Sequence, residues 1–203
     1  MDKFSFFFAF YGLILGLAVT ELLGGFAGLV RARALKRLEP QTALLALLPF
    51  LIIVATWIEA WDSLRDVKLD LAALWSPVLL ATCYYLAASV VFPSDPADFD
   101  DLASYYSSRK RFVVAMLTAA EVLITVGYSH IYVFLLENRP AEFWLWMVPF
   151  KIVILAAFLA IFLARSRRAN LLALAVTLLL FTLPYWQYGI VRETIARHYG
   201  YVL

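Results

Sequence analysis

Apolar residues gather into six long runs along this chain, with short polar connections between them. The runs cover residues 4–30, 42–64, 71–92, 112–136, 141–164 and 170–191. Each run reaches the roughly 20 residues that a helix needs to cross hydrocarbon about 30 Å thick. A backbone in lipid must satisfy its own hydrogen bonds, and the runs lack the alternation of barrel strands. The pattern therefore predicts an all-α, polytopic membrane protein, a bundle of six transmembrane helices that forms one domain over residues 1–203.

The composition of the chain strengthens this interpretation. Its 203 residues are 64% hydrophobic and 16% charged, with a mean hydropathy of +0.83. A soluble domain is about half apolar and about a quarter charged, so we expect a lipid bilayer around this protein. The formal net charge of +2 argues against a nucleic-acid partner. Cys83 is the only cysteine, which excludes disulfides within the chain and CxxC redox or metal motifs.

Positive side chains are divided unequally between the two ends of the predicted bundle. One set of connections holds ten of them: Arg31, Arg33, Lys36, Arg37, Arg109, Lys110, Arg111, Arg165, Arg167 and Arg168. The other set, which includes both termini, holds six: Lys3, Arg65, Lys68, Arg139, Arg192 and Arg197. Short cytoplasmic connections carry the excess of Lys and Arg, so we expect both termini on the outer, periplasmic side of a bacterial inner membrane. The six tryptophans fall in the outer halves of their runs, as an aromatic belt does.

Small residues recur at every fourth position of the first run. The row consists of Gly12, Gly16, Thr20, Gly24 and Gly28. Such a row lets another helix approach closely, whether that helix belongs to the same chain, to a second copy or to another membrane protein. Glu21 lies at the flank of the row, so we expect it to face protein rather than lipid.

Ionisable residues also interrupt three other runs. Lys151 is the one basic residue deep within a run, and it needs an acid from another helix; Glu121 is the first candidate and Glu21 the second. Thr125 and Tyr128 continue the Glu121 face toward the outer surface. Glu59 and Asp62 lie nearer that surface, where they could form the mouth of a hydrated route.

Two hypotheses for function remain open at this point. In the first, protons, ions or a small solute move along a polar path built from Glu21, Glu59, Asp62, Glu121, Lys151, Thr125 and Tyr128. In the second, the protein is a structural or accessory membrane subunit whose buried charges and glycine row serve helix packing and assembly. An enzyme is less favoured, because the chain contains no HExxH, GxSxG, P-loop or dinucleotide motif. Neither a metal nor a cofactor is expected.

Overall fold

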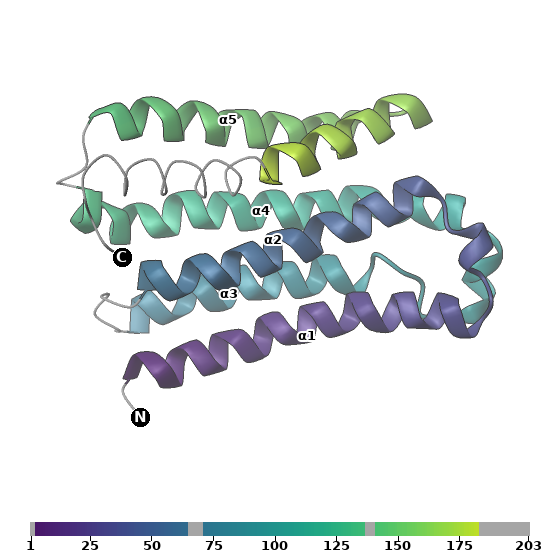
Figure 1. Ribbon diagram of the computed structural model, residues 1–203, viewed down its shortest axis with the longest axis horizontal. Helices are drawn as coiled ribbons and strands as arrows, with labels where there is room; N and C mark the ends of the chain where they lie inside the picture. Colours follow the sequence, from purple (N-terminus) through teal and green to yellow (C-terminus); the bar gives the residue numbers. More distant parts are fainter. Residues whose placement is uncertain (1–2, 65–70, 137–140, 183–203) are drawn as a thin grey trace, which may run out of the picture.

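The computed structural model describes residues 3–64, 71–136 and 141–182, with side chains at 4–60, 75–95, 98–125 and 148–182 (Figure 1). Over these ranges the chain is all helix and short connections, without a strand, so the predicted all-α class is confirmed. The labelled helices are α1 (Lys3–Arg31), α2 (Pro40–Leu64), α3 (Leu71–Ser89), α4 (Leu102–Leu136) and α5 (Ala141–Leu163). Two short 3-10 helices, η1 (Leu35–Arg37) and η2 (Pro96–Asp100), lie in the connections, and residues 167–182 form a further helix.

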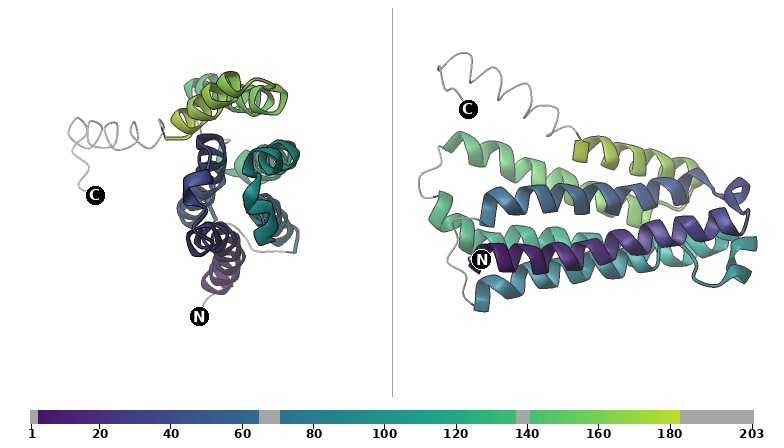
Figure 2. Two further views of the ribbon diagram at one scale, coloured as in Figure 1. Left: turned by 90° about the vertical axis from the view of Figure 1, so that its right-hand side faces the viewer. Right: turned by 60° about the horizontal axis from the view of Figure 1, so that its bottom comes forward.

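The helices alternate in direction and lie nearly side by side along one long axis (Figures 1 and 2). Helix α3 packs against both α1 and α4, while α2 contacts α1 and α5 contacts α4. Their shared interior is apolar and close-packed, with Tyr11, Tyr84, Leu117 and Phe158 among its fully buried side chains. The bundle thus has one core, which runs between the helices along their length.

Two helices in the described part of the chain are long and apolar enough to cross a membrane. They are Phe4–Arg31, with 28 residues, and Pro40–Ala60, with 21 residues. Another apolar helical stretch, Val148–Leu163, is shorter. Six long helical segments thus lie at the positions of the predicted runs, but in the described part of the chain only two of them meet the length and apolar composition of a membrane span.

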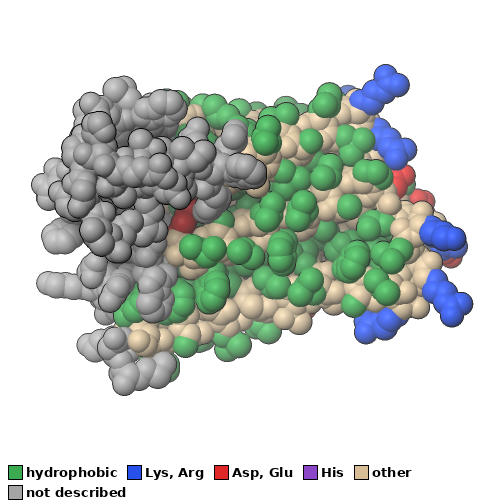
Figure 3. Space-filling model, in the orientation of Figure 1, with side chains coloured by type: hydrophobic (Ala, Val, Ile, Leu, Met, Phe, Trp, Pro, Cys, Tyr) green, Lys and Arg blue, Asp and Glu red, His purple; other side chains and the backbone are tan. Residues whose placement is uncertain are grey.

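The outer surface of the bundle is divided between apolar and basic side chains. Large apolar residues are exposed along the middle of the helices, and the Lys and Arg side chains that Figure 3 colours lie at one end, while the opposite end is outside the described residues. That basic end is where α1 and α5 finish and where α2 and α4 begin (Figure 1). The connections that carry the ten basic residues thus meet at one end of the molecule.

Helix α4 begins ten residues before the predicted run at 112. Asp101 explains the earlier start, because its Oδ1 accepts a hydrogen bond from the Ser104 backbone N–H at 3.0 Å, which is the geometry of an N-cap. The hydropathy pattern did not predict these first ten helical residues, since residues 102–111 are mostly polar or basic.

The glycine row of α1 contributes less to packing within the chain than its spacing suggests. A Cβ at Gly16 or Gly24 would meet nothing within 4 Å, whereas one at Gly12 would lie 3.2 Å from Nε1 of Trp57. At Gly28 the nearest atom is Cζ of Phe99, at an ordinary 3.6 Å. Thr20 is exposed and donates a hydrogen bond to the carbonyl of Gly16 at 2.8 Å. A contact of this row with a second copy or another membrane protein stays a prediction.

The closest approach to α1 occurs one residue away from that row, at Gly25. A Cβ built there would lie 2.6 Å from Cβ of Phe92, a separation that real side chains do not reach. Phe92 follows α3 and is itself buried, so it has little room to move. The absence of a side chain at Gly25 is therefore what allows the end of α3 to pack on α1.

We expect Gly25→Ala to lower the free energy of unfolding by about 1–3 kcal/mol, the usual cost of overpacking a core. Gly24→Ala is the matched control, because its Cβ enters open space and the better helix propensity of alanine is worth up to about 1 kcal/mol. Thermal unfolding of the purified variants, followed by circular dichroism, distinguishes the two. Equal shifts for both variants would contradict the proposed contact.

Candidate functional site

The central feature of the candidate site is an ion pair between α4 and α5. Nζ of Lys151 donates a hydrogen bond to Oε1 of Glu121 at 2.6 Å. The Glu121 side chain is only 6% exposed, while the Lys151 side chain is 26% exposed. The acid that the sequence favoured as the partner of Lys151 is thus the acid that the structure places beside it.

The helical period brings both charges to the packed faces of their helices. On α4, Val114, Leu117 and Glu121 are buried and follow one another at intervals of three and four residues. On α5, Lys151 precedes buried Ile154 and Phe158 with the same spacing. Each charge therefore replaces one apolar residue in a buried stripe, and the two stripes meet.

The pair lies well away from the basic end of the bundle. Glu121 comes ten residues after Arg111, which corresponds to about 15 Å along the axis at 1.5 Å per residue. An isolated carboxylate at such a place would be strongly disfavoured, and the direct contact with an ammonium group offsets its lost hydration.

The remaining residues of the predicted path do not join this pair in the described part of the structure. The exposed Thr125 hydroxyl donates to the backbone carbonyl of Glu121 at 2.8 Å, so it bonds its own helix rather than the charged groups. Glu59 is exposed on α2. Asp62 belongs to α2 and Tyr128 to α4, but their side chains lie outside the described residues.

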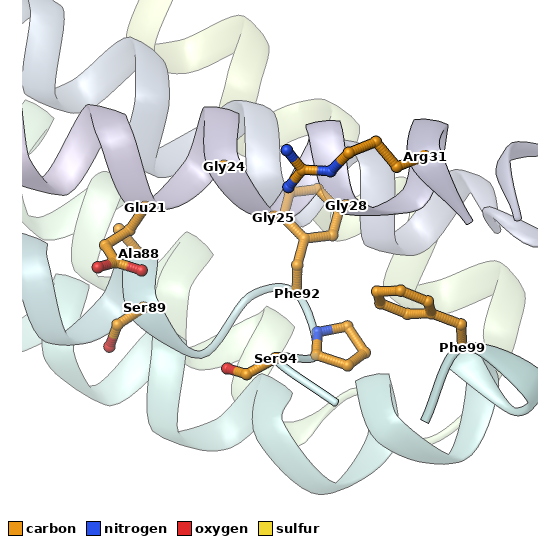
Figure 4. Close-up of a pocket in the computed structure, with 11 residues that line it drawn as sticks. Glu21, Gly24, Gly25, Gly28, Arg31, Ala88, Ser89, Phe92, Ser94 and Phe99 are labelled. Carbon is orange, nitrogen blue, oxygen red and sulfur yellow. The ribbon is translucent and has the colours of Figure 1, made fainter. Parts of the chain in front are cut away.

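Glu21 occupies a separate place, in a pocket between α1 and the end of α3 (Figure 4). Tyr85 on α3 donates a hydrogen bond to Oε1 of Glu21 at 3.4 Å. The carboxylate faces a neighbouring helix, as expected, but the residue is exposed at the edge of the contact. The pocket has a volume of about 220 Å³ and is lined by Glu21, Gly24, Gly25, Gly28, Arg31, Ala88, Ser89, Phe92, Pro93, Ser94 and Phe99.

A second group of buried polar residues closes the basic end, and the sequence did not reveal it. Asn170 is 3% exposed; its Nδ2 donates to Oε1 of Gln41 at 2.7 Å and also to the hydroxyl of Tyr106. These residues come from α2, α4 and the helix at 167–182. Each of these three residues lies near the beginning of a helix, where polar residues are common. Their residue types therefore gave no indication that they contact one another.

Electrostatics at this end reflect the same burial. Desolvation raises the pKa of Tyr106 to about 12, against a smaller opposing effect of the Asn170 hydrogen bond. Lys110 is also buried, and its Nζ donates to the carbonyl of Ala164 at 2.6 Å, just after the last turn of α5. Desolvation lowers the pKa of Lys110, with a further contribution from Arg111. A cation at a helix C-terminus interacts favourably with the helix dipole.

The described residues contain no group of three or more His, Cys, Asp or Glu side chains that could hold a metal ion. The chain also matches no protein family, no curated protein and no solved structure.

Removal of one partner of the ion pair should destabilise the protein more than removal of both. Lys151→Met leaves a nearly buried carboxylate without its cation, which we expect to cost about 3 kcal/mol. Glu121→Gln should cost less, because the amide oxygen still accepts a hydrogen bond and Lys151 is partly exposed. The double variant should recover much of the loss. Thermal unfolding of all four proteins gives the coupling energy; strictly additive losses would argue against the pair.

Tyr106 should make stability depend on alkaline pH. Because its pKa rises from the ordinary value of 10.0 to about 12 on folding, its contribution is complete below pH 10 and is lost as the pH rises toward 12. We expect the unfolding temperature to fall more steeply over this range for the wild type than for Tyr106→Phe. Parallel pH profiles for the two proteins would show that the phenol has no such role.

Proposed function

We propose that this protein is an integral membrane protein with six transmembrane helices and with both termini on the outer side of a bacterial inner membrane. Support comes from the two long apolar helices, from the apolar residues exposed along the bundle and from the three connections with ten Lys and Arg residues, which lie together at one end. The basic end would face the cytoplasm, because positive residues prefer that side.

We further propose that protons, ions or a small solute cross this membrane by way of Glu121 and Lys151. The observation that carries the proposal is the direct 2.6 Å contact between an acid and a base within an apolar bundle. A buried ion pair adds little net stability compared with apolar residues of the same volume, so packing alone gives little reason for it. Ionisable residues inside membranes commonly serve proton relays and ion or substrate sites.

The unequal exposure of the two side chains suggests how the pair would work. Lys151 is more accessible than Glu121, so an arriving group would meet the ammonium first. Once Lys151 turns away, the nearly buried carboxylate of Glu121 would lack its cation, and a transported proton or cation would take that place. Return of Lys151 would release that proton or cation. Glu59, Asp62, Thr125 and Tyr128 would extend this path toward the outer surface, with Glu21 as a separate acid on α1.

A structural or accessory membrane subunit is the second candidate. The observation that favours it is the closed contact itself, which joins α4 directly to α5. The hydrogen bonds of Asn170 with Gln41 and Tyr106 tie further helices together at the basic end. In this case the pair would specify which helices associate, and the glycine row of α1 would remain available to a partner or a second copy.

Ion flux through reconstituted vesicles separates the two candidates. We expect wild-type protein in liposomes to dissipate an imposed pH gradient, measured with a pH-sensitive dye inside the vesicles, and Glu121→Gln to lower the rate by about tenfold or more. Glu39→Gln is the matched control, since it changes an acid at the basic end, outside the proposed path.

Unchanged flux in Glu121→Gln would remove the pair from the transport mechanism. Absence of proton flux and of ion flux in the wild type, together with a marked loss of stability in Lys151→Met, would favour the structural candidate instead.

A further inference from the structure

Two polar contacts hold the turn that follows α5 onto α4. We use the name hairpin tip for residues 164–170, which include this turn and the start of the next helix. Nζ of Lys110 donates a hydrogen bond to the carbonyl of Ala164 at 2.6 Å, and Nδ2 of Asn170 donates one to the hydroxyl of Tyr106. Tyr106 and Lys110 are four residues apart, so they lie on one face of α4. Both ends of the hairpin tip are thus bound to the same face of α4.

The hairpin tip also contacts the beginning of α2. Nδ2 of Asn170 donates a second hydrogen bond, to Oε1 of Gln41 at 2.7 Å. Gln41, Tyr106, Lys110 and Asn170 are all buried, although each lies near the basic end of the bundle. We call these four residues the basic-end latch. Its hydrogen bonds join the hairpin tip to two other helices.

The closed arrangement leaves some polar groups near the latch without full compensation. Oδ1 of Asn170 and Oγ1 of Thr42 are buried and have no hydrogen-bond partner among the described residues. Lys110 is a buried cation, and no carboxylate in the described part of the chain forms an ion pair with it. Burial of such groups costs free energy, which they would recover on contact with water. This cost favours separation of the hairpin tip from α4, against the hydrogen bonds that hold it there.

An apolar layer lies between the latch and the ion pair of Glu121 with Lys151. Glu121 follows Lys110 by eleven residues, about 16 Å along α4. The side chains that fill the layer are fully buried: Val114 and Leu117 on α4, and Phe158 and Ile161 on α5. A close-packed apolar layer does not admit ions or hydrated solutes. In this arrangement the ion pair is therefore closed off from the basic end.

We propose that the basic-end latch is the gate of the transport path at that end, and that the structure has this gate closed. Access from the basic end to Glu121 requires the hairpin tip to move away from α4 and α2. This movement breaks the hydrogen bonds of the latch together, and it opens the apolar layer because α5 carries one side of that layer. The inference rests on the proposed transport function and adds to it the contacts that keep the path closed.

The reaction rate of a thiol inside the apolar layer measures how often the gate opens. The probe is Val114→Cys in a Cys83→Ser background, so that the chain carries a single thiol at a buried position. A water-soluble, cationic methanethiosulfonate is added to the full chain in lipid nanodiscs. We expect slow reaction while the latch is intact. Asn170→Ala should raise the rate about tenfold, because both hydrogen bonds of the amide are lost.

Two adjacent tyrosines provide a matched pair of variants. Tyr106→Phe removes one hydrogen bond of the latch, and we expect it to raise the rate about threefold. Tyr105→Phe removes a hydroxyl from the next residue, but that hydroxyl donates to the carbonyls of Val90 and Phe92, after the end of α3. This control should therefore leave the rate unchanged.

A second thiol distinguishes opening of the gate from general loosening of the bundle. Ala18→Cys in the same background places the thiol in the core on α1, where Asn170→Ala should not change its rate. The assignment is wrong if the thiol at position 114 reacts as fast as one at exposed position 168 when the latch is intact. It is also wrong if Asn170→Ala does not accelerate the reaction, if it accelerates both buried thiols equally, or if Tyr105→Phe acts like Tyr106→Phe.

Thiol reactivity does not require ion flux, so the gate and the transport path can fail separately. Unchanged reactivity in Asn170→Ala, together with flux that depends on Glu121, would overturn the gate and leave the transport path in place. Faster reactivity in a protein that shows no flux would overturn the proposed transport function, and with it the role of the latch as a gate.

Discussion

A carboxylate among apolar helices needs a cation beside it, and Glu121 meets Lys151 at 2.6 Å. This requirement links the position of α4 to that of α5, because neither helix offers its own charged residue a partner of opposite sign within four positions in the sequence. The buried stripes of Leu117 and Phe158 pack the two helices together, and the ion pair adds a charged contact between them.

Glu21 shows a different solution for the same type of side chain. It lies on α1 at the border of the contact with α3, where it accepts a weak hydrogen bond from Tyr85 and keeps one side open. Glu121 is closed off by a cation, so a ligand must displace Lys151 to reach it. A ligand can reach Glu21 without moving any charged group. The first arrangement suits a switch between two states.

The helices at the basic end of the bundle are joined by buried hydrogen bonds. Asn170 joins Gln41 to Tyr106 with its amide, and Lys110 binds the carbonyl that follows α5. These contacts connect the beginnings of α2 and α4 with the turn between α5 and the helix at 167–182. If ions or solutes cross this protein, they must separate these helices or pass beside them at the basic end.

The sequence by itself determined the all-α class, the approximate places of the helices and the collection of basic residues at one end, because hydropathy and charge are properties of local segments. It also indicated Glu121 as the partner of Lys151, since a deep lysine has few acids at comparable depth.

The sequence did not show that Gly25, rather than Gly24, makes the close contact on α1. Adjacent positions differ by about 100° around a helix, and which one faces α3 depends on where Phe92 lies after that helix ends. The meeting of Asn170 with Gln41, 129 residues away in the chain, likewise became visible only in three dimensions. Contacts between distant segments depend on the rotation and axial shift of whole helices, and only the packing of the complete bundle decides these.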